Sequence, residues 1–153
     1  NGSKQLNQAV LQLINENKML KDKIALFEAN ETIKIKEEIR NNYEDFSELK
    51  LGIKKLEGIN PNIIKDIVFD LKKESDDLCL VITNISNNKV TLSIGVSDNL
   101  VKEKGIDAGV IIRESAKAIQ GGGGGQAFYA TAGGKNTSGI DDAINKVKEI
   151  LSR

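Results

Sequence analysis

The chain has 153 residues, 39% hydrophobic and only 4% aromatic, so a modest core of aliphatic side chains is expected. Lysine plus arginine and aspartate plus glutamate number 22 each, and the net charge of zero argues against a strongly basic nucleic-acid-binding surface while allowing a local basic patch. The lack of histidine and the single Cys79 exclude an internal disulfide and Ser-His catalysis, and they make a cysteine-based zinc site implausible.

Cys79 lies in the apolar run 78–82 and is expected to be a buried core thiol. No apolar stretch is long enough to span a bilayer and no signal peptide is present, so a cytoplasmic location is expected. The chain starts Asn1-Gly2-Ser3 without Met, and we expect it to be a fragment of a longer protein.

Residues 4–46 are predicted to form a helical coiled-coil arm. Apolar residues alternate at the a and d positions of a heptad repeat, with a lone Asn17 at an a position, where asparagine fixes register at a cost in stability. We expect this seam to pair with a second copy of the chain or to pack on a helix outside the fragment. The alternative is that Asn17 is a solvated position on a helix that packs on one side. The seam comprises Leu6, Val10, Leu13, Asn17, Leu20, Ile24 and Phe27.

A second apolar spacing, Ile35, Ile39, Tyr43 and Phe46, fits a helical period better than a strand. The arm is therefore predicted to be one long helix reaching residue 46, or two helices broken near residues 29–31.

Residues 47–153 are predicted to form a small mixed β-sheet domain flanked by helices, so the fold class is α/β in the α+β sense. Apolar alternation predicts a strand near 49–53, and Asn60-Pro61 starts a helix that ends near 73. Residues 78–96 indicate a hairpin, 98–104 a polar connection, and 108–119 a helix capped by Asp107. A short strand at 126–132 and a terminal helix from about 140 complete the domain.

A run of five glycines, Gly121, Gly122, Gly123, Gly124 and Gly125, precedes this last strand, and Gly133-Gly134-Lys135 follows it. The spacing matches neither a P-loop nor a dinucleotide-binding motif. We expect a glycine-rich turn whose backbone amides bind phosphate, with Arg113, Lys117 and Lys135, and also Lys102 and Lys104, as nearby cations. Gln126 and Tyr129 complete the predicted nucleic-acid-binding residues, with Tyr129 exposed and Phe128 in the core.

The paired carboxylates Glu37-Glu38, Asp76-Asp77 and Asp141-Asp142 are adjacent in sequence, and solvated faces or caps are expected there. No catalytic or metal-binding residues are predicted in this chain.

The segment from Asp107 to Lys135, with its two glycine clusters and a following helix, resembles the C-terminal (C-Ala, DHH-associated) domain of bacterial-type alanyl-tRNA synthetases. The coiled-coil arm ahead of the domain is also typical of that family, and the resemblance covers roughly residues 5–152. One departure is Gln126-Ala127-Phe128-Tyr129, where the family commonly has Arg-Pro-Asp-Met after the glycines. The arginine that the resemblance would place against phosphate is therefore absent, and Gln126 stands in its place.

The resemblance implies a tRNA-binding and oligomerisation domain that contacts the tRNA outer corner and supports aminoacylation and editing by upstream domains. It implies tRNA, those domains and a second copy of the chain as partners, and no membrane. Such a fragment is expected to be non-catalytic and free of cofactors, with ATP, Mg²⁺ and Zn²⁺ confined to the upstream domains. The alternative is the substrate-binding domain of a DHH-type phosphoesterase or single-strand nuclease.

Overall fold

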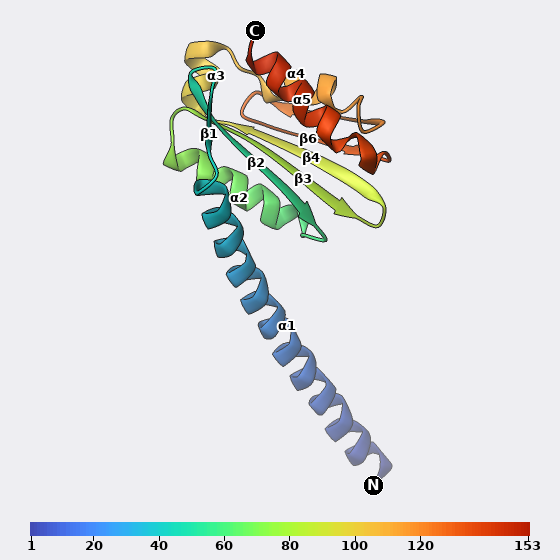
Figure 1. The fold of residues 1–153 in the computed structure, drawn as a ribbon. Helices are drawn as coiled ribbons and strands as arrows, with labels where there is room; N and C mark the ends of the chain where they lie inside the picture. Colours follow the sequence, from blue (N-terminus) through green and yellow to red (C-terminus); the bar gives the residue numbers. More distant parts are fainter. The chain divides into compact units, whose positions relative to one another are not determined.

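The computed structural model describes all residues, 1–153, and shows an α/β protein with a six-stranded mixed sheet (Figure 1). The chain divides into two compact units, Asn1–Ile35 and Lys36–Arg153. The helix α1 (Gly2–Arg40) runs through the first unit and into the second without a break at residues 29–31. The alternative of two helices is therefore wrong.

Within the first unit, the apolar side chains of the predicted seam are all exposed. Their exposed fractions range from 46% at Val10 to 76% at Phe27, and Asn17 is exposed as well. A stripe of leucines and isoleucines open to solvent on a long helix is what an unpaired coiled-coil strand presents.

The prediction of helix up to residue 46 is wrong. α1 ends at Arg40, and Glu44–Phe46 forms the edge strand β1, paired antiparallel with β2 (Leu49–Glu57). Ser47 and Glu48 turn the chain between the two strands, with positive φ angles of 45° and 64°. Phe46 packs at the margin of the core from the strand, so its helix-like spacing from Ile39 reflects a chance overlap of periods.

The sheet has the strand order β1-β2-β3-β4-β6-β5. β2 and β3 (Leu78–Ser86) are parallel and are connected by α2 (Pro61–Glu74), as a parallel pair requires. β4 (Lys89–Val96) forms a hairpin with β3 through Asn87 and Asn88, and it pairs antiparallel with β6 (Tyr129–Gly134). β5 (Gly121–Gln126) is the outer strand beside β6.

The helices lie on both faces of the sheet. α2 packs on β3 and β4 from one side, whereas α4 (Ala108–Ser115) and α5 (Ile140–Leu151) cover the other side over the larger hydrophobic core (Figure 1). Successive residues of a strand point to opposite faces. In β6, Ala130 and Ala132 belong to the core beneath α4 and α5, so Tyr129, Thr131 and Gly133 face the side of α2.

Local capping explains where two helices start. The Asn60 side chain accepts a hydrogen bond from the amide of Asn62 with Pro61 in the first turn, and the Asp107 carboxylate accepts bonds from Gly109 and Val110. Both predicted starts are confirmed. α4 ends at Ser115 and gives way to turns, four residues earlier than predicted.

The connection predicted at 98–104 is instead the helix α3 (Asp98–Lys104). Only Leu100 of this helix is buried, so its sequence has no apolar periodicity that would indicate a helix. A single turn of 3₁₀ helix, Thr137–Gly139, precedes α5. No helix is long and apolar enough to cross a bilayer.

Candidate nucleic-acid interface

The glycine run does not form the expected turn. Residues 121–125 are extended and form most of β5, with Gly122 opposite Gly133 and Gly124 opposite Thr131 in the antiparallel ladder with β6. A phosphate-binding nest needs successive residues of alternating handedness, which an extended strand does not provide. The prediction of an amide nest in this run is therefore wrong.

Alternate glycines of β5 are required by the fold. A Cβ atom added to Gly121, Gly123 or Gly125 would lie 2.0–2.4 Å from a carbonyl oxygen of β6, for example 2.0 Å from Thr131 at position 123. Real Cβ atoms do not approach backbone oxygen so closely. No other residue fits these three positions without moving the neighbouring strand.

Three other glycines of β5 and β6 are not required by packing within the chain, whereas a Cβ atom on Gly134 would clash with the carbonyl oxygen of Ile119. A Cβ atom at Gly122, Gly124 or Gly133 would meet no atom within 4 Å. The register of β5 and β6 puts all three on the side of the sheet that carries α2, where α2 covers β3 and β4. The fold would accept a side chain at each of these positions. Because glycine occupies them, the backbone there is uncovered on this side of the sheet.

We call this uncovered surface the open face. It is bordered by three shallow cavities of about 540, 240 and 460 Å³, which follow one another from the β5–β6 turn, past α2, to the start of β5. Small or short side chains dominate it, so the sheet backbone is accessible along its length. It comprises Thr91 of β4, Gly122 and Gly124 of β5, and Tyr129, Thr131 and Gly133 of β6.

Three lysines around the open face have no carboxylate partner. Lys89 and Lys135 line the cavity beside Gly122 and Gly133, and Lys65 of α2 lines the two others. All three are exposed. Most other lysines of the second unit are held in ion pairs, so these three can meet phosphate at the open face without breaking an existing pair.

Aromatic side chains gather at the other end of the open face. The Phe69 ring of α2 lies 6.1 Å from that of Phe128 and 5.3 Å from that of Tyr129, between ring centroids. Phe128 occupies the two-residue β5–β6 turn and is 38% exposed, whereas Tyr129 is half-buried. The expected assignment of Phe128 to the core is therefore wrong, and Tyr129, expected at the surface, is only partly exposed.

Tyr129 is fixed in place. Burial raises the pKa of its hydroxyl, and a hydrogen bond with Ser93 acts in the opposite direction. The half-buried ring lies between α2 and β6, with its hydroxyl at Ser93 of β4.

The predicted cations on the helices are not brought to the open face. Arg113 and Lys117 belong to the segment that packs on the opposite side of the sheet, and Lys117 pairs with Glu114 at 3.1 Å. Lys104 of α3 pairs with Glu48 at 3.2 Å, and Lys102 lines no cavity beside the glycines. Gln126 and Lys135, by contrast, border the open face.

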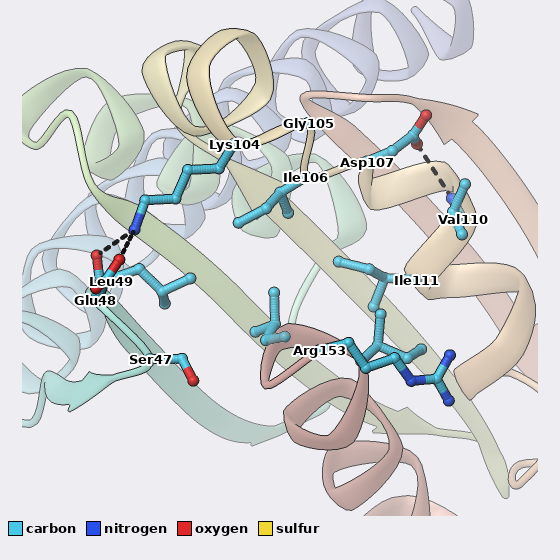
Figure 2. Close-up of a pocket in the computed structure, with 12 residues that line it drawn as sticks. Ser47, Glu48, Leu49, Lys104, Gly105, Ile106, Asp107, Val110, Ile111 and Arg153 are labelled. Carbon is cyan, nitrogen blue, oxygen red and sulfur yellow. Dashed lines mark hydrogen bonds and ion pairs between the residues drawn. The ribbon is translucent and has the colours of Figure 1, made fainter.

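A separate cavity of about 360 Å³ lies between the β1–β2 turn, the link between α3 and α4, and the end of α5 (Figure 2). Apolar side chains such as Leu49, Ile106 and Ile111 form its walls, and the Lys104–Glu48 ion pair crosses its rim. None of the glycines of β5 lines it. It is therefore distinct from the open face.

No group of three or more histidine, cysteine or carboxylate side chains comes together in a way that could hold a metal ion. Cys79 is fully buried, and burial raises the pKa of its thiol to about 12. It is thus a core residue, as predicted, with no accessible thiolate near neutral pH.

Sequence reasoning missed four residues of this surface: Lys65, Phe69, Lys89 and Thr91. Lys65 and Phe69 are four residues apart and so share one face of α2, while Lys89 and Thr91 alternate with buried Val90 along β4. This periodicity places them outside the core, but nothing in it indicates that β6 lies next to β4 and brings them beside the glycines.

Residues 48–153 match the DHHA1 domain family. Over 148 residues the chain is 34% identical to an alanine–tRNA ligase of Cytophaga hutchinsonii, and over 151 residues 38% identical to one of Bacteroides thetaiotaomicron. These alignments cover 97% and 98% of this chain but only 17% of each relative. The chain therefore spans about a sixth of the length of the curated relatives it matches.

Among solved structures, the crystal structure of the C-Ala domain from Aquifex aeolicus alanyl-tRNA synthetase superimposes with a TM-score of 0.69 at 28% identity. It covers 73% of this chain and 99% of that one. A DHH domain protein, PF0399, shares the fold at a TM-score of 0.55 and 10% identity, over 82% of this chain and 31% of that one. These matches confirm the resemblance seen in residues 107–135.

Proposed function

Because this chain belongs to the DHHA1 domain family, we propose that it is the tRNA-binding and oligomerisation domain of an alanine–tRNA ligase. It would contact the outer corner of tRNA and support aminoacylation and editing by the other domains of that enzyme in the cytoplasm. ATP, Mg²⁺ and Zn²⁺ would be bound by those other domains. The chain itself would carry no catalytic residue.

The observation that carries this proposal is the set of glycines on the open face. Gly122, Gly124 and Gly133 have room for a side chain, yet none is present. A bare, flat backbone suits close approach of a rigid, extended partner such as a folded RNA. Protein–RNA contacts to sugar and phosphate use backbone groups together with a few cations.

The charge distribution is consistent with a modest, salt-dependent affinity. The chain has no net charge, but Lys65, Lys89 and Lys135 are unpaired around the open face. Each phosphate that a lysine neutralises contributes to the dependence of binding on salt. Three such contacts would give a shallow slope compared with that of a strongly basic domain.

The alternative of a DHH-type phosphoesterase or nuclease domain is not favoured. The curated relatives described above are tRNA ligases, matched over almost the whole chain including the arm. The likeness to the PF0399 DHH domain concerns the fold alone.

The arm supplies the oligomerisation part of the proposal. An exposed a/d seam of seven residues, with one asparagine, would pair with the same seam of a second copy. Pairing would remove apolar side chains from water. The free energy gained is about 25 cal/mol for each Å² of apolar surface buried.

The direct test is a titration of fluorescently labelled tRNA with the 153-residue chain at several salt concentrations. We expect saturable binding whose affinity falls as salt rises. In Lys89→Gln and Lys135→Gln, the slope of log K against log salt should become shallower by about 0.9 per residue. Lys102→Gln, an exposed lysine away from the open face, is the matched control.

No salt-dependent binding up to about 0.1 mM, the weak end of non-specific nucleic-acid affinity, would contradict the proposal. So would equal slopes for the Lys89 and Lys102 variants, because they would show that phosphates do not lie along the open face.

A further inference from the structure

The end of the open face next to α2 is lined by aromatic side chains, whereas short side chains dominate the rest. A cavity of about 540 Å³ is lined there by three aromatic rings, Phe69, Phe128 and Tyr129, and by Lys65. Its volume is within the range of small-ligand sites. Two of these residues come from the hairpin after the glycines and two from α2, so the cavity exists only because the fold joins segments about 60 residues apart.

We infer that this aromatic pocket receives one unstacked nucleobase of the bound RNA. The inference rests on the proposed function and specifies how a base, as distinct from the phosphate backbone, is held. Single-stranded and loop bases are recognised by stacking on aromatic rings, which is worth about 1–3 kcal/mol per base.

The ring geometry leaves room for such stacking. The Phe69 and Phe128 planes are inclined at 70° and those of Phe69 and Tyr129 at 51°, so neither pair is stacked face to face. The Phe69 and Phe128 rings meet in a T shape and the Phe69 and Tyr129 rings are tilted, so no ring face is covered by a parallel ring. A planar base can therefore stack on a ring face without displacing a ring partner.

The exposed ring of the pocket is held from behind. The Lys72 ammonium lies 4.6 Å from the centroid of the Phe128 ring and 5.2 Å from that of Phe69, and only 6% of its side chain is exposed. A cation this close attracts the ring electrostatically. Phe128 is thereby kept in position at the tip of a two-residue turn, where an aromatic side chain would otherwise be mobile.

Polar groups at the pocket can contact the edges of a base. The side chains of Gln126 and Thr131 line it and form no hydrogen bond within the chain. The Lys65 ammonium, 5.9 Å from the Phe69 ring centroid, has no carboxylate partner and can meet the phosphate attached to that base. Apolar rings, unused amide and hydroxyl groups and an unpaired cation together match a nucleotide better than an apolar peptide.

The test compares Phe69→Leu and Phe128→Leu with the matched control Phe46→Leu, which changes a ring on β1 at the far edge of the sheet. We expect both pocket variants to bind labelled tRNA about 5- to 100-fold more weakly. The salt slope should be unchanged, because no phosphate contact is lost. Phe46→Leu should bind like the unaltered chain.

Unaltered tRNA affinity of both pocket variants, in a chain that binds tRNA with the expected salt dependence, would overturn the inference and leave the proposed function standing. A chain that does not bind tRNA at all would remove both.

A second measurement on the unaltered chain guards against variants that fold poorly. Tetra-adenylate should shift the NMR signals of the Phe128 and Tyr129 ring protons, whereas tripolyphosphate should move only lysine signals. Lysine shifts with both probes and no ring shifts with tetra-adenylate would also overturn the inference.

Discussion

The ammonium of Lys72 lies 3.4 Å from the carbonyl oxygen of Phe128 and 4.6 Å from the centroid of the same residue's ring. One buried lysine of α2 thus holds both the backbone and the side chain of the β5–β6 turn. The turn is fixed further by two backbone bonds, in which Val96 donates to the carbonyl of Phe128 and Ala108 to that of Ala127. The hairpin is therefore anchored at its tip, although five of the six residues of β5 are glycines.

Lys72→Met keeps the aliphatic stem but removes the cation. We expect the free energy of unfolding to change by less than about 1 kcal/mol, because the lost contacts to Phe128 and Asp98 are offset by relief of the lysine's desolvation. Hydrogen exchange of the Val96 and Ala108 amides should become faster, since the turn they hold is loosened. Unchanged exchange at both amides would show that Lys72 does not anchor the hairpin.

Gly123→Ala should be among the most damaging single changes in the domain. The new Cβ atom would lie 2.0 Å from the Thr131 oxygen, so β5 must move away from β6. We expect the free energy of unfolding, measured by heat or urea, to fall by about 1–3 kcal/mol, the typical cost of overpacking. A stability equal to that of the unaltered chain would mean that β5 is not held in the described ladder. The same clash makes Gly123 unsuitable as a probe of RNA binding.

The Arg40–Glu74 pair joins the end of α1 to the end of α2 through two hydrogen bonds of 2.6 and 2.8 Å. The hydrogen bond from Arg40 holds the pKa of Glu74 below its ordinary value of 4.5. The pair therefore stabilises the fold at neutral pH, and this contribution is lost as the pH falls below about 4.5 and through the lowered pKa.

Arg40→Met should accordingly reduce the free energy of unfolding by about 0.2–1 kcal/mol at pH 7, as expected for an exposed pair. The difference from the unaltered chain should disappear in acid, in urea titrations repeated from pH 7 to pH 3. A difference that stays constant across this range would assign the effect of Arg40 to packing and not to its charge.

Substitutions in the seam of the arm should change how the chain assembles. Asn17→Leu should raise the melting temperature of the helical signal and broaden the distribution of oligomers, because a buried asparagine at an a position sacrifices stability for register. Leu13→Glu with Leu20→Glu should give a monomer in analytical ultracentrifugation. Met19→Glu, an exposed apolar residue outside the seam, is the control. Equal masses for the seam variant and the control would contradict pairing through the seam.

Most elements after Ser47 could be predicted, because their local signals agree with the fold, whereas α3 and β5 could not. Asn60-Pro61 and Asp107 mark helix starts by their capping chemistry, and the alternation at Val90, Leu92 and Ile94 marks a strand with one buried face. The resemblance of residues 107–135 to the synthetase C-terminal domain rests on the two glycine clusters in this segment.

The glycine run could not be assigned from local signals. Glycine carries no side-chain periodicity, so nothing in residues 121–125 indicates a strand, and only the ladder with β6 makes them one. The pocket beside it depends on strand order, which brings Phe69 of α2 against Tyr129 of β6. A contact between elements this far apart in the chain leaves no trace in the sequence of either one.

The most direct measurement of the central claim is the tRNA affinity of Gly122→Val and Gly124→Val, with Gly2→Val in the arm as the control. All three glycines have open space for a side chain. The free energy of unfolding of each variant should therefore be within about 0.5 kcal/mol of that of the unaltered chain. If the bare open face is where tRNA approaches, the two β5 variants should bind tRNA at least about tenfold more weakly, a loss of about 1.4 kcal/mol, and Gly2→Val should not. Folded β5 variants with undiminished tRNA affinity would contradict it.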